Sequence, residues 1–175
     1  AGVNAFATWG GRFVPATMLK IDASSPYALT AVNENAWQEK NKRDFKRIAK
    51  TNALEVLRRE PLSYRALRQL GLYYALTGNL AKGRELVKLS AKLTRRDATG
   101  QMWLAEDYGR TKQIDDALQA FDIVIRTEPD TREVAFQAMG GALADTKFRE
   151  SFVRLASKNP PWLPEFLAFN IGTTA

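Results

Sequence analysis

The chain has 175 residues, of which 45% are hydrophobic, and it carries a formal net charge of +7 with no cysteine and no histidine. This composition excludes disulfides, Cys/His metal sites and any catalytic triad or dyad that uses histidine or cysteine. The positive charge favours acidic partners, such as an acidic protein face, an anionic polymer or a lipid surface. The length suits one globular domain or about five stacked helix pairs.

The sequence contains no transmembrane segment, because no apolar run approaches the ~18 residues needed to span a bilayer. The chain starts with Ala1 and not with methionine. We therefore expect a processed or truncated chain, from which a leader or membrane anchor could have been removed. The lack of cysteine suits cytosol and periplasm alike. The basic residues form no nucleic-acid-binding motif, so no nucleic-acid partner is expected.

The N-terminal part is predicted to be a lead-in followed by a first helix pair. Residues 1–13 are apolar and contain Gly10 and Gly11, and residues 14–21 are predicted to form the tail of a helix. Residues 22–26 end that helix and start the next. Residues 26–61 are predicted to hold helices at about 28–40 and 45–59, with a turn near residues 41–44.

Residues 64–129 contain two copies of a 34-residue helix–turn–helix pattern. Three positions of the first copy correspond to positions 34 residues later in the second (104 − 70, 105 − 71, 108 − 74). Leu70, Gly71 and Tyr74 correspond to Leu104, Ala105 and Tyr108. Residues four apart share one helix face, and a glycine beside them lets the partner helix approach closely. Turns are predicted at residues 77–79 and 110–113, and Pro129 ends the second copy.

Each returning helix carries an apolar stripe at helical spacing. The stripe consists of Leu80, Gly83, Leu86, Val87 and Ser90 in the first copy, and of Ala117, Ala120, Phe121 and Val124 in the second. A further pair is predicted at residues 131–144 and 147–157, followed by a proline stop at residues 160–164. We expect Trp162, Phe166 and Phe169 to cover the last apolar face, and residues 171–175 to fray.

This period and this residue order resemble the tetratricopeptide repeat (TPR). The resemblance implies an all-α fold, a TPR-type α-solenoid of antiparallel helix pairs with a C-terminal capping helix. It divides the chain into a lead-in (1–25), an array (26–159, with repeats at about 26–61, 64–97, 98–131 and 132–159) and a cap and tail (160–175). An ordinary helical bundle with coincidental spacing is the alternative.

A narrower likeness concerns the runs at residues 89–97, 101–107, 125–129 and 160–162. These runs look like bacterial TPR proteins associated with exopolysaccharide biosynthesis and export. Such proteins usually have an N-terminal membrane anchor and place the repeats outside the inner membrane. The likeness implies a location in the bacterial cell envelope, on the periplasmic side, with the cytoplasm as the alternative.

The TPR resemblance also implies a concave groove lined by the first helix of each pair. The candidate groove residues are Arg65, Arg68, Gln69, Leu72, Met102, Trp103, Glu106, Arg110, Phe136 and Gln137, with Glu133 beside them and Glu34, Gln38 and Lys42 in the weaker repeat. Arginines that fork onto carboxylates, with Trp103 and Phe136 as apolar anchors, suit an acidic and aromatic peptide or partner helix. Each residue can equally be solvated or packed, and Trp103 can lie in the core between repeats.

Two further binding modes can be compared with the sequence. The carboxylate clamp of chaperone-binding TPR proteins needs Lys and Asn at fixed groove positions, where this chain has Arg68, Leu72, Glu34 and Gln38, so chaperone-tail binding is disfavoured. A basic helix face could contact anionic polymer or lipid, or could be an ordinary solvated surface. It consists of Lys82, Arg84, Lys88 and Lys92, followed by Arg95 and Arg96.

Catalysis is not expected, and neither is a metal or other cofactor. Adjacent carboxylates such as Glu106 and Asp107, or Asp115 and Asp116, point apart on a helix and do not form an acid/base couple. There is no Gly-rich phosphate loop and no metal-ligand cluster. We therefore expect a non-catalytic protein-interaction scaffold that serves exopolysaccharide assembly or export. The alternatives are a direct binder of anionic polysaccharide or of a membrane surface, and a polysaccharide-modifying enzyme with a convergent carboxylate pair.

Overall fold

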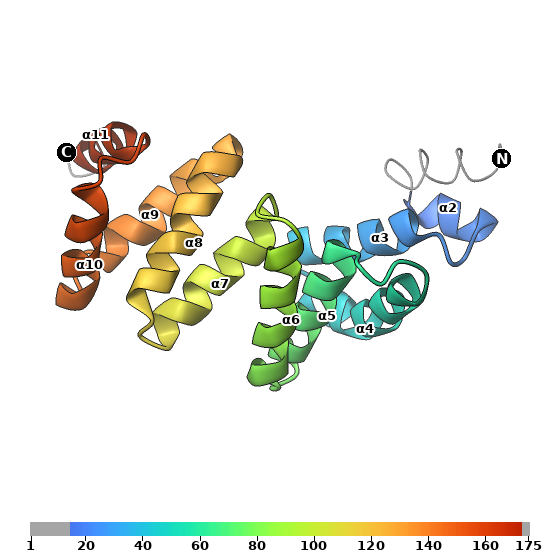
Figure 1. Cartoon of the computed structure of the whole chain (residues 1–175). Helices are drawn as coiled ribbons and strands as arrows, with labels where there is room; N and C mark the ends of the chain where they lie inside the picture. Colours follow the sequence, from blue (N-terminus) through green and yellow to red (C-terminus); the bar gives the residue numbers. More distant parts are fainter. Residues whose placement is uncertain (1–14, 173–175) are drawn as a thin grey trace. The chain divides into compact units, whose positions relative to one another are not determined.

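The computed structural model describes residues 15–172, and this part of the chain is built from ten α-helices and one short 3-10 helix without any β-strand (Figure 1). The all-α prediction is therefore confirmed for these residues. No helix among them is long and apolar enough to cross a membrane. The predictions for residues 1–14 and for residues 173–175 lie outside the described residues.

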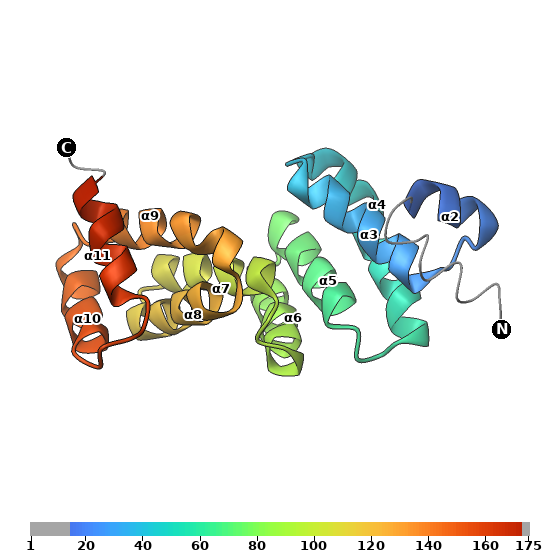
Figure 2. The same ribbon diagram turned by 90° about the horizontal axis from the view of Figure 1, so that it is seen from above.

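The chain divides after Leu93 into two compact units. The first, unit 1, contains α2 (Pro15–Ile21), α3 (Pro26–Gln38), α4 (Lys42–Arg59), α5 (Tyr64–Leu76) and α6 (Leu80–Leu93). The second, unit 2, contains α7 (Ala98–Arg110), α8 (Ile114–Thr127), the 3-10 helix η1 (Pro129–Thr131), α9 (Arg132–Ala142), α10 (Thr146–Ala156) and α11 (Leu163–Gly172). Throughout unit 1, and from α7 to α9 in unit 2, helices that follow one another in the chain pack as neighbours (Figure 2).

Helix ends recur at a 34-residue offset through the middle of the chain. The starts of α5, α7 and α9, at positions 64, 98 and 132, keep this offset, as do the ends of α4, α6 and α8, at positions 59, 93 and 127. The first pair departs from it, because the starts of α3 and α5, like those of α4 and α6, differ by 38 (64 − 26, 80 − 42). The excess of four is about one helical turn, so α3 lies one turn early and α4 is one turn longer at its start. This corrects the expected helix starts at residues 28 and 45.

One turn motif joins the two helices in three of the pairs. The second residue after α3, α5 and α7 has a positive φ, namely Lys40 (55°), Gly78 (95°) and Lys112 (62°). In each turn the next N–H bonds back to the carbonyl five residues earlier: Asn41 to Ala36, Asn79 to Tyr74 and Gln113 to Tyr108. This Schellman motif satisfies carbonyls that the helix end leaves open. Asn41 and Asn79 then cap the following helices by accepting N–H groups at 3.1 and 3.2 Å.

Two glycines let α5 and α6 meet backbone to backbone. A Cβ placed on Gly71 would lie 2.7 Å from Val87 Cγ2 and 2.9 Å from the carbonyl oxygen of Gly83. A Cβ on Gly83 would lie 2.8 Å from the carbonyl oxygen of Gly71. No side chain fits at either position, as the sequence predicted for Gly71. At the corresponding positions of the next pair, α7 and α8 have buried alanines, Ala105 and Ala117.

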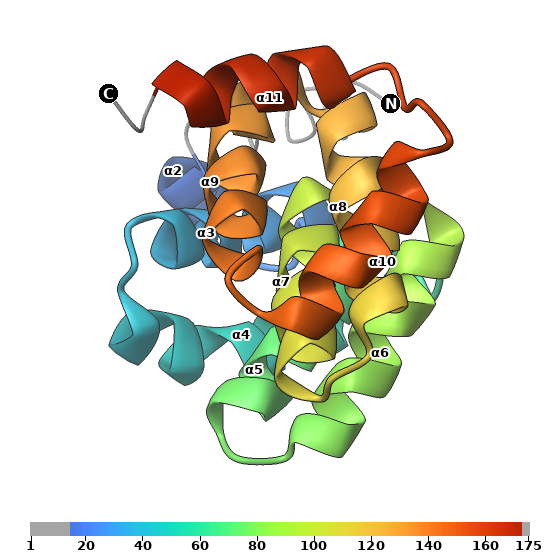
Figure 3. The ribbon, with the colours of Figure 1, turned by 90° about the vertical axis from the view of Figure 1, so that its left-hand side faces the viewer.

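Unit 2 is closed at its C-terminal end by an aromatic core. The Phe136 ring of α9 lies 5.5 Å from the Phe166 ring and 6.3 Å from the Trp162 ring, and Phe166 lies 5.0 Å from Phe152 of α10. The indole N–H of Trp162 donates to Asp122 of α8 at 2.7 Å, so the polar edge of this buried ring is also satisfied. Consequently α11 packs against α9, while α10 packs against α8 (Figure 3).

A hydrogen bond fixes the start of α10. Asp145 is its N-cap and accepts the backbone N–H of Phe148 at 3.0 Å. This hydrogen bond lowers the pKa of the Asp145 carboxyl below its ordinary value, and the ammonium of Lys112 at 3.6 Å acts in the same direction. The cap therefore stays ionised at neutral pH, where it also complements the positive end of the helix dipole.

The shared turn motif leads to a stability prediction for two exposed glycines. Gly78→Ala should lower the free energy of unfolding by about 1 kcal/mol, because its φ of 95° is costly for a residue with a Cβ although no atom lies within 4 Å. Gly141→Ala, in α9, also has open space but no positive φ, so it should raise stability by about 0.5–1 kcal/mol. Urea denaturation followed by circular dichroism measures both, and equal effects of the two substitutions would contradict the turn assignment.

Candidate functional site

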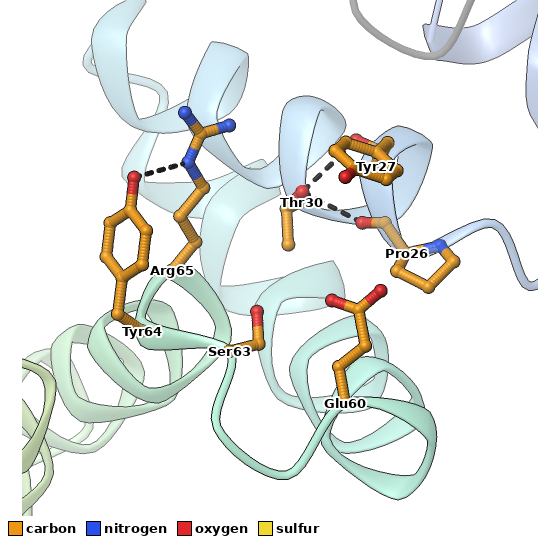
Figure 4. A pocket seen from close by; sticks show the side chains of 7 residues that line it. All are labelled: Pro26, Tyr27, Thr30, Glu60, Ser63, Tyr64 and Arg65. Carbon is orange, nitrogen blue, oxygen red and sulfur yellow. Dashed lines mark hydrogen bonds between the residues drawn. The ribbon is translucent and has the colours of Figure 1, made fainter. Parts of the chain in front are cut away.

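Unit 1 contains a cavity of about 310 Å³ where α3, the end of α4 and the start of α5 come together (Figure 4). It is lined by Pro26, Tyr27 and Thr30 of α3, by Glu60 and Ser63 of the connection after α4, and by Tyr64 and Arg65 of α5. Of the predicted groove residues, Arg65 is the one that lines this cavity. We refer to it as the α3–α5 pocket.

Local sequence explains why α3 and α5 both begin at this pocket. Ser25 caps α3 by accepting the N–H of Ala28, and Pro26 occupies the first helical turn, where a missing N–H has no cost. Ser63 is the N-cap residue of α5, although its hydroxyl makes no capping hydrogen bond. The pocket therefore lies where two first helices of consecutive pairs begin.

The pocket offers aromatic surface together with polar groups of both charges. Tyr27 is 40% exposed, and the Arg65 guanidinium lies over the Tyr64 ring at 5.7 Å from its centroid while its Nε donates to the Tyr64 hydroxyl at 3.0 Å. The Thr30 hydroxyl is already used, since it donates to the carbonyl of Pro26 at 2.8 Å. Glu60 is exposed and forms no ion pair with another described residue.

This set of groups can bind a ligand but is poorly suited to catalysis. The described residues that line the pocket supply one carboxylate, one guanidinium and hydroxyls, without a second carboxylate to complete an acid/base couple. No cluster of His, Cys, Asp and Glu in residues 15–172 could hold a metal ion. A guanidinium, a carboxylate and phenol rings are groups that can contact a ligand with its own donors and acceptors.

Three of the four predicted groove residues on α5 are buried inside unit 1, which corrects their expected role. The Arg68 guanidinium forms an ion pair with Glu34 of α3 at 2.5 Å. The Gln69 amide donates to the carbonyl of Thr30 at 2.9 Å, and Leu72 is 1% exposed. The side chains of Glu34 and Arg68, which were both predicted to line the groove, therefore pair with each other inside unit 1.

The predicted groove residues of unit 2 are divided between core and surface. Trp103 and Phe136 are buried, and Phe136 is covered by the C-terminal segment that supplies Trp162 and Phe166. Both rings thus lie in the core of unit 2, which is the placement that the sequence had left open for Trp103. Met102 is half-buried, while the exposed positions are Glu106, Arg110, Glu133 and Gln137.

The predicted basic face is only partly exposed. Lys82 and Lys92 of α6 are exposed, while Arg84 and Lys88 are half-buried. The Lys82 ammonium lies 4.2 Å from the centroid of the Tyr74 ring, which is a cation–π contact. Arg95 and Arg96 follow in unit 2 and are exposed. Gln38 and Lys42, predicted for the weaker repeat, are also exposed, whereas Glu34 is half-buried.

Comparison of the sequence with protein-family models and with curated proteins finds no match. The residues of the pocket alone therefore indicate what it can bind. Tyr27, Glu60 and Ser63 were not predicted as site residues, because they belong to helix ends and not to groove positions of a 34-residue repeat. The available signal was the run of helix-start residues, Ser25 with Pro26 and Ser63 with Tyr64.

The Arg68–Glu34 pair leads to a prediction about unit 1. Arg68→Met should lower the free energy of unfolding by about 2–3 kcal/mol, since it leaves the partly buried Glu34 carboxylate without its guanidinium. The matched control is Arg65→Met, an exposed arginine of the same helix, which should change stability by less than about 0.5 kcal/mol. Chemical denaturation of the two variants checks this, and equal stabilities would show that the ion pair contributes nothing.

Proposed function

We propose that this chain is a TPR-like helical-repeat protein that works as a non-catalytic interaction module. In this proposal, unit 1 holds a short segment of a partner protein in the α3–α5 pocket. The single observation that carries the proposal is the pocket itself, which combines aromatic surface, a guanidinium and a carboxylate at the start of two consecutive first helices.

The repeat character is supported by the helix ends and by the turns. Helix starts at positions 64, 98 and 132 and helix ends at positions 59, 93 and 127 keep a 34-residue offset, which is the TPR period. The same Schellman turn with the same hydrogen bonds joins three pairs. In a helical bundle without repeats, the helix ends and the Schellman turns would not be expected to recur at the same period.

The size of the pocket limits what it can hold. A volume of about 310 Å³ is at the small end of the range of roughly 300–1,000 Å³ for ligand sites. Such a volume accommodates a few residues of an extended segment and not a whole helix. The proposal therefore favours a peptide partner over the partner helix considered from the sequence.

The charges of the pocket define the partner segment. Arg65 can pair with a carboxylate, in line with an acidic partner, and Glu60 can pair with a cationic or N–H group of the same segment. The exposed ring of Tyr27 offers contact to an apolar or aromatic side chain. We therefore propose a segment that presents an acidic residue, an apolar residue and a donor group in succession.

The cellular setting follows from the likeness to bacterial TPR proteins that accompany exopolysaccharide genes. We propose that the partner belongs to an exopolysaccharide assembly or export system and that the chain works on the periplasmic side of the envelope. The proposed partner is a protein of that system, and the pocket would tether it without altering the polymer.

Peptide selection tests the proposed function. A random peptide library displayed on phage is selected on the purified full chain, and the affinity of an enriched peptide is measured by fluorescence polarisation. Tyr27→Ala and Arg65→Ala should each weaken binding about tenfold or more. The first removes the aromatic contact to the peptide, and the second removes the guanidinium that would pair with its carboxylate. The matched control, Arg43→Ala, changes an exposed arginine of α4 that does not line the pocket and should bind as the wild type does.

Two results of this selection would refute the proposal. Enriched peptides whose affinity is unchanged by both pocket substitutions would locate the binding surface elsewhere and refute the proposed site. A selection that yields no peptide with measurable affinity would refute the peptide-binding role of this chain.

A further inference from the structure

A cluster of cations lies on the surface of unit 1 at the first half of α4, and we refer to it as the α4 basic face. It consists of Lys40, Lys42, Arg43, Lys46, Arg47 and Lys50, all of them exposed. One carboxylate, Asp44, lies within this run, and it pairs with Arg47 at 3.6 Å. The other five cations form no ion pair with another described residue.

Helical spacing gathers these charges on the outer side of α4. Lys42, Lys46 and Lys50 are four residues apart, so they follow one another along one face. Phe45 and Ala49 of the same helix are fully buried in unit 1 and lie beside this row, so the charged row borders the buried face of α4. Leu54, 42% exposed, continues the row that begins with Lys46 and Lys50.

The placement of these charges works against the stability of α4. Cations near the start of a helix oppose the positive end of its dipole, and like charges four residues apart repel each other. The usual arrangement is seen in α8, which begins with Asp115 and Asp116 and carries Arg126 in its last turn; in α4 it is limited to Asp44 in the first turn and to Arg58 and Arg59 in the last. Six cations with a single carboxylate among them are a local arrangement that disfavours its own helix, and such an arrangement is characteristic of a functional surface.

We propose that the α4 basic face docks this protein on the surface of a bilayer that contains anionic lipids. Clusters of four to eight Lys and Arg on an amphipathic helix are attracted to anionic leaflets, and each cation near the surface adds to the binding energy. This surface is distinct from the α3–α5 pocket, none of whose lining residues belongs to it.

Two features of the face favour a lipid surface over a polymer or a nucleic acid. Four of the six cations are lysines, which act as point charges and suit a plane of mobile headgroups, whereas stereospecific binding uses arginine forks. Single-stranded nucleic acids need aromatic rings on which bases stack, and Phe45, the aromatic residue of α4, is fully buried. The exposed Leu54 side chain can enter the headgroup region beside the cations.

Sedimentation with lipid vesicles tests the proposal. The full chain is mixed with vesicles of phosphatidylcholine alone, or of phosphatidylcholine and phosphatidylglycerol at a ratio of roughly 3:1, at salt from about 0.05 M to about 0.5 M. The wild type should bind the anionic vesicles only, and this binding should weaken as salt rises. Arg43→Glu combined with Lys46→Glu and Lys50→Glu should reduce binding at least tenfold.

The matched control applies the same charge change elsewhere. Lys92→Glu combined with Arg95→Glu and Arg96→Glu reverses three exposed cations outside α4, so it should retain more binding than the α4 variant. Equal loss in both variants would overturn the proposal, because binding would then depend on net charge alone. Absence of wild-type binding to anionic vesicles, or retention of polygalacturonate without binding to vesicles, would overturn it as well.

Thermal melting separates loss of docking from loss of folding. Because the α4 variant places one carboxylate, at position 43, in the first turn of α4 and creates opposite-charge pairs of position 46 with Lys42 and of position 43 with Arg47, its melting temperature should equal or exceed that of the wild type. If the triple variant does not fold, Lys42→Gln combined with Lys46→Gln repeats the test without charge reversal. Wild-type binding by that folded variant would contradict the proposal.

Discussion

The hydrogen bonds of one buried amide, the side chain of Gln69, fix how α3 lies against the rest of unit 1. Its Nε2 donates to the carbonyl of Thr30 at 2.9 Å, and its Oε1 accepts from Nδ2 of Asn33 at 3.0 Å. Asn33 in turn accepts from Asn52 of α4 at 2.9 Å. A buried polar group without its partner is costly, so displacing α3 along its axis would break several of these bonds at once. The α3–α5 pocket depends on this register, because Pro26 and Tyr27 belong to the first turn of α3.

The features of the fold that the sequence predicted well are those that follow from apolar spacing. In the second copy of the repeat, the predicted stripe of Ala117, Ala120, Phe121 and Val124 is buried throughout. Gly71 was predicted to allow close helix contact, and the distances around it confirm this. Burial of apolar side chains and absence of a Cβ are properties that a sequence states directly, because both depend on residue type and period alone.

The sequence did not reveal the register of the first helix pair or the partners of the buried polar side chains. The sequence predicted helix starts at about residues 28 and 45, yet α3 and α4 begin at Pro26 and Lys42, each 38 residues before the corresponding helix of the next pair (64 − 26, 80 − 42). With this larger offset, Asn33 lies at the position that Gly71 occupies in the next pair, so a polar side chain takes the place of a close backbone contact. Arg68 was assigned to a partner-binding groove, but its guanidinium pairs with Glu34 inside the chain. Only the folded arrangement decides whether such a charge faces solvent or another charge.

The two units bury their helix faces with different kinds of side chain. Unit 2 closes its last face with rings, since Phe136, Trp162 and Phe166 cover one another and are buried together. Unit 1 holds its helices partly through buried amides and an ion pair, which need exact partners. The exposed cations at the start of α4 belong to the same unit, so unit 1 combines a pocket with a charged surface. The two proposed contacts, one with a peptide and one with a membrane, would together hold a partner at the bilayer surface.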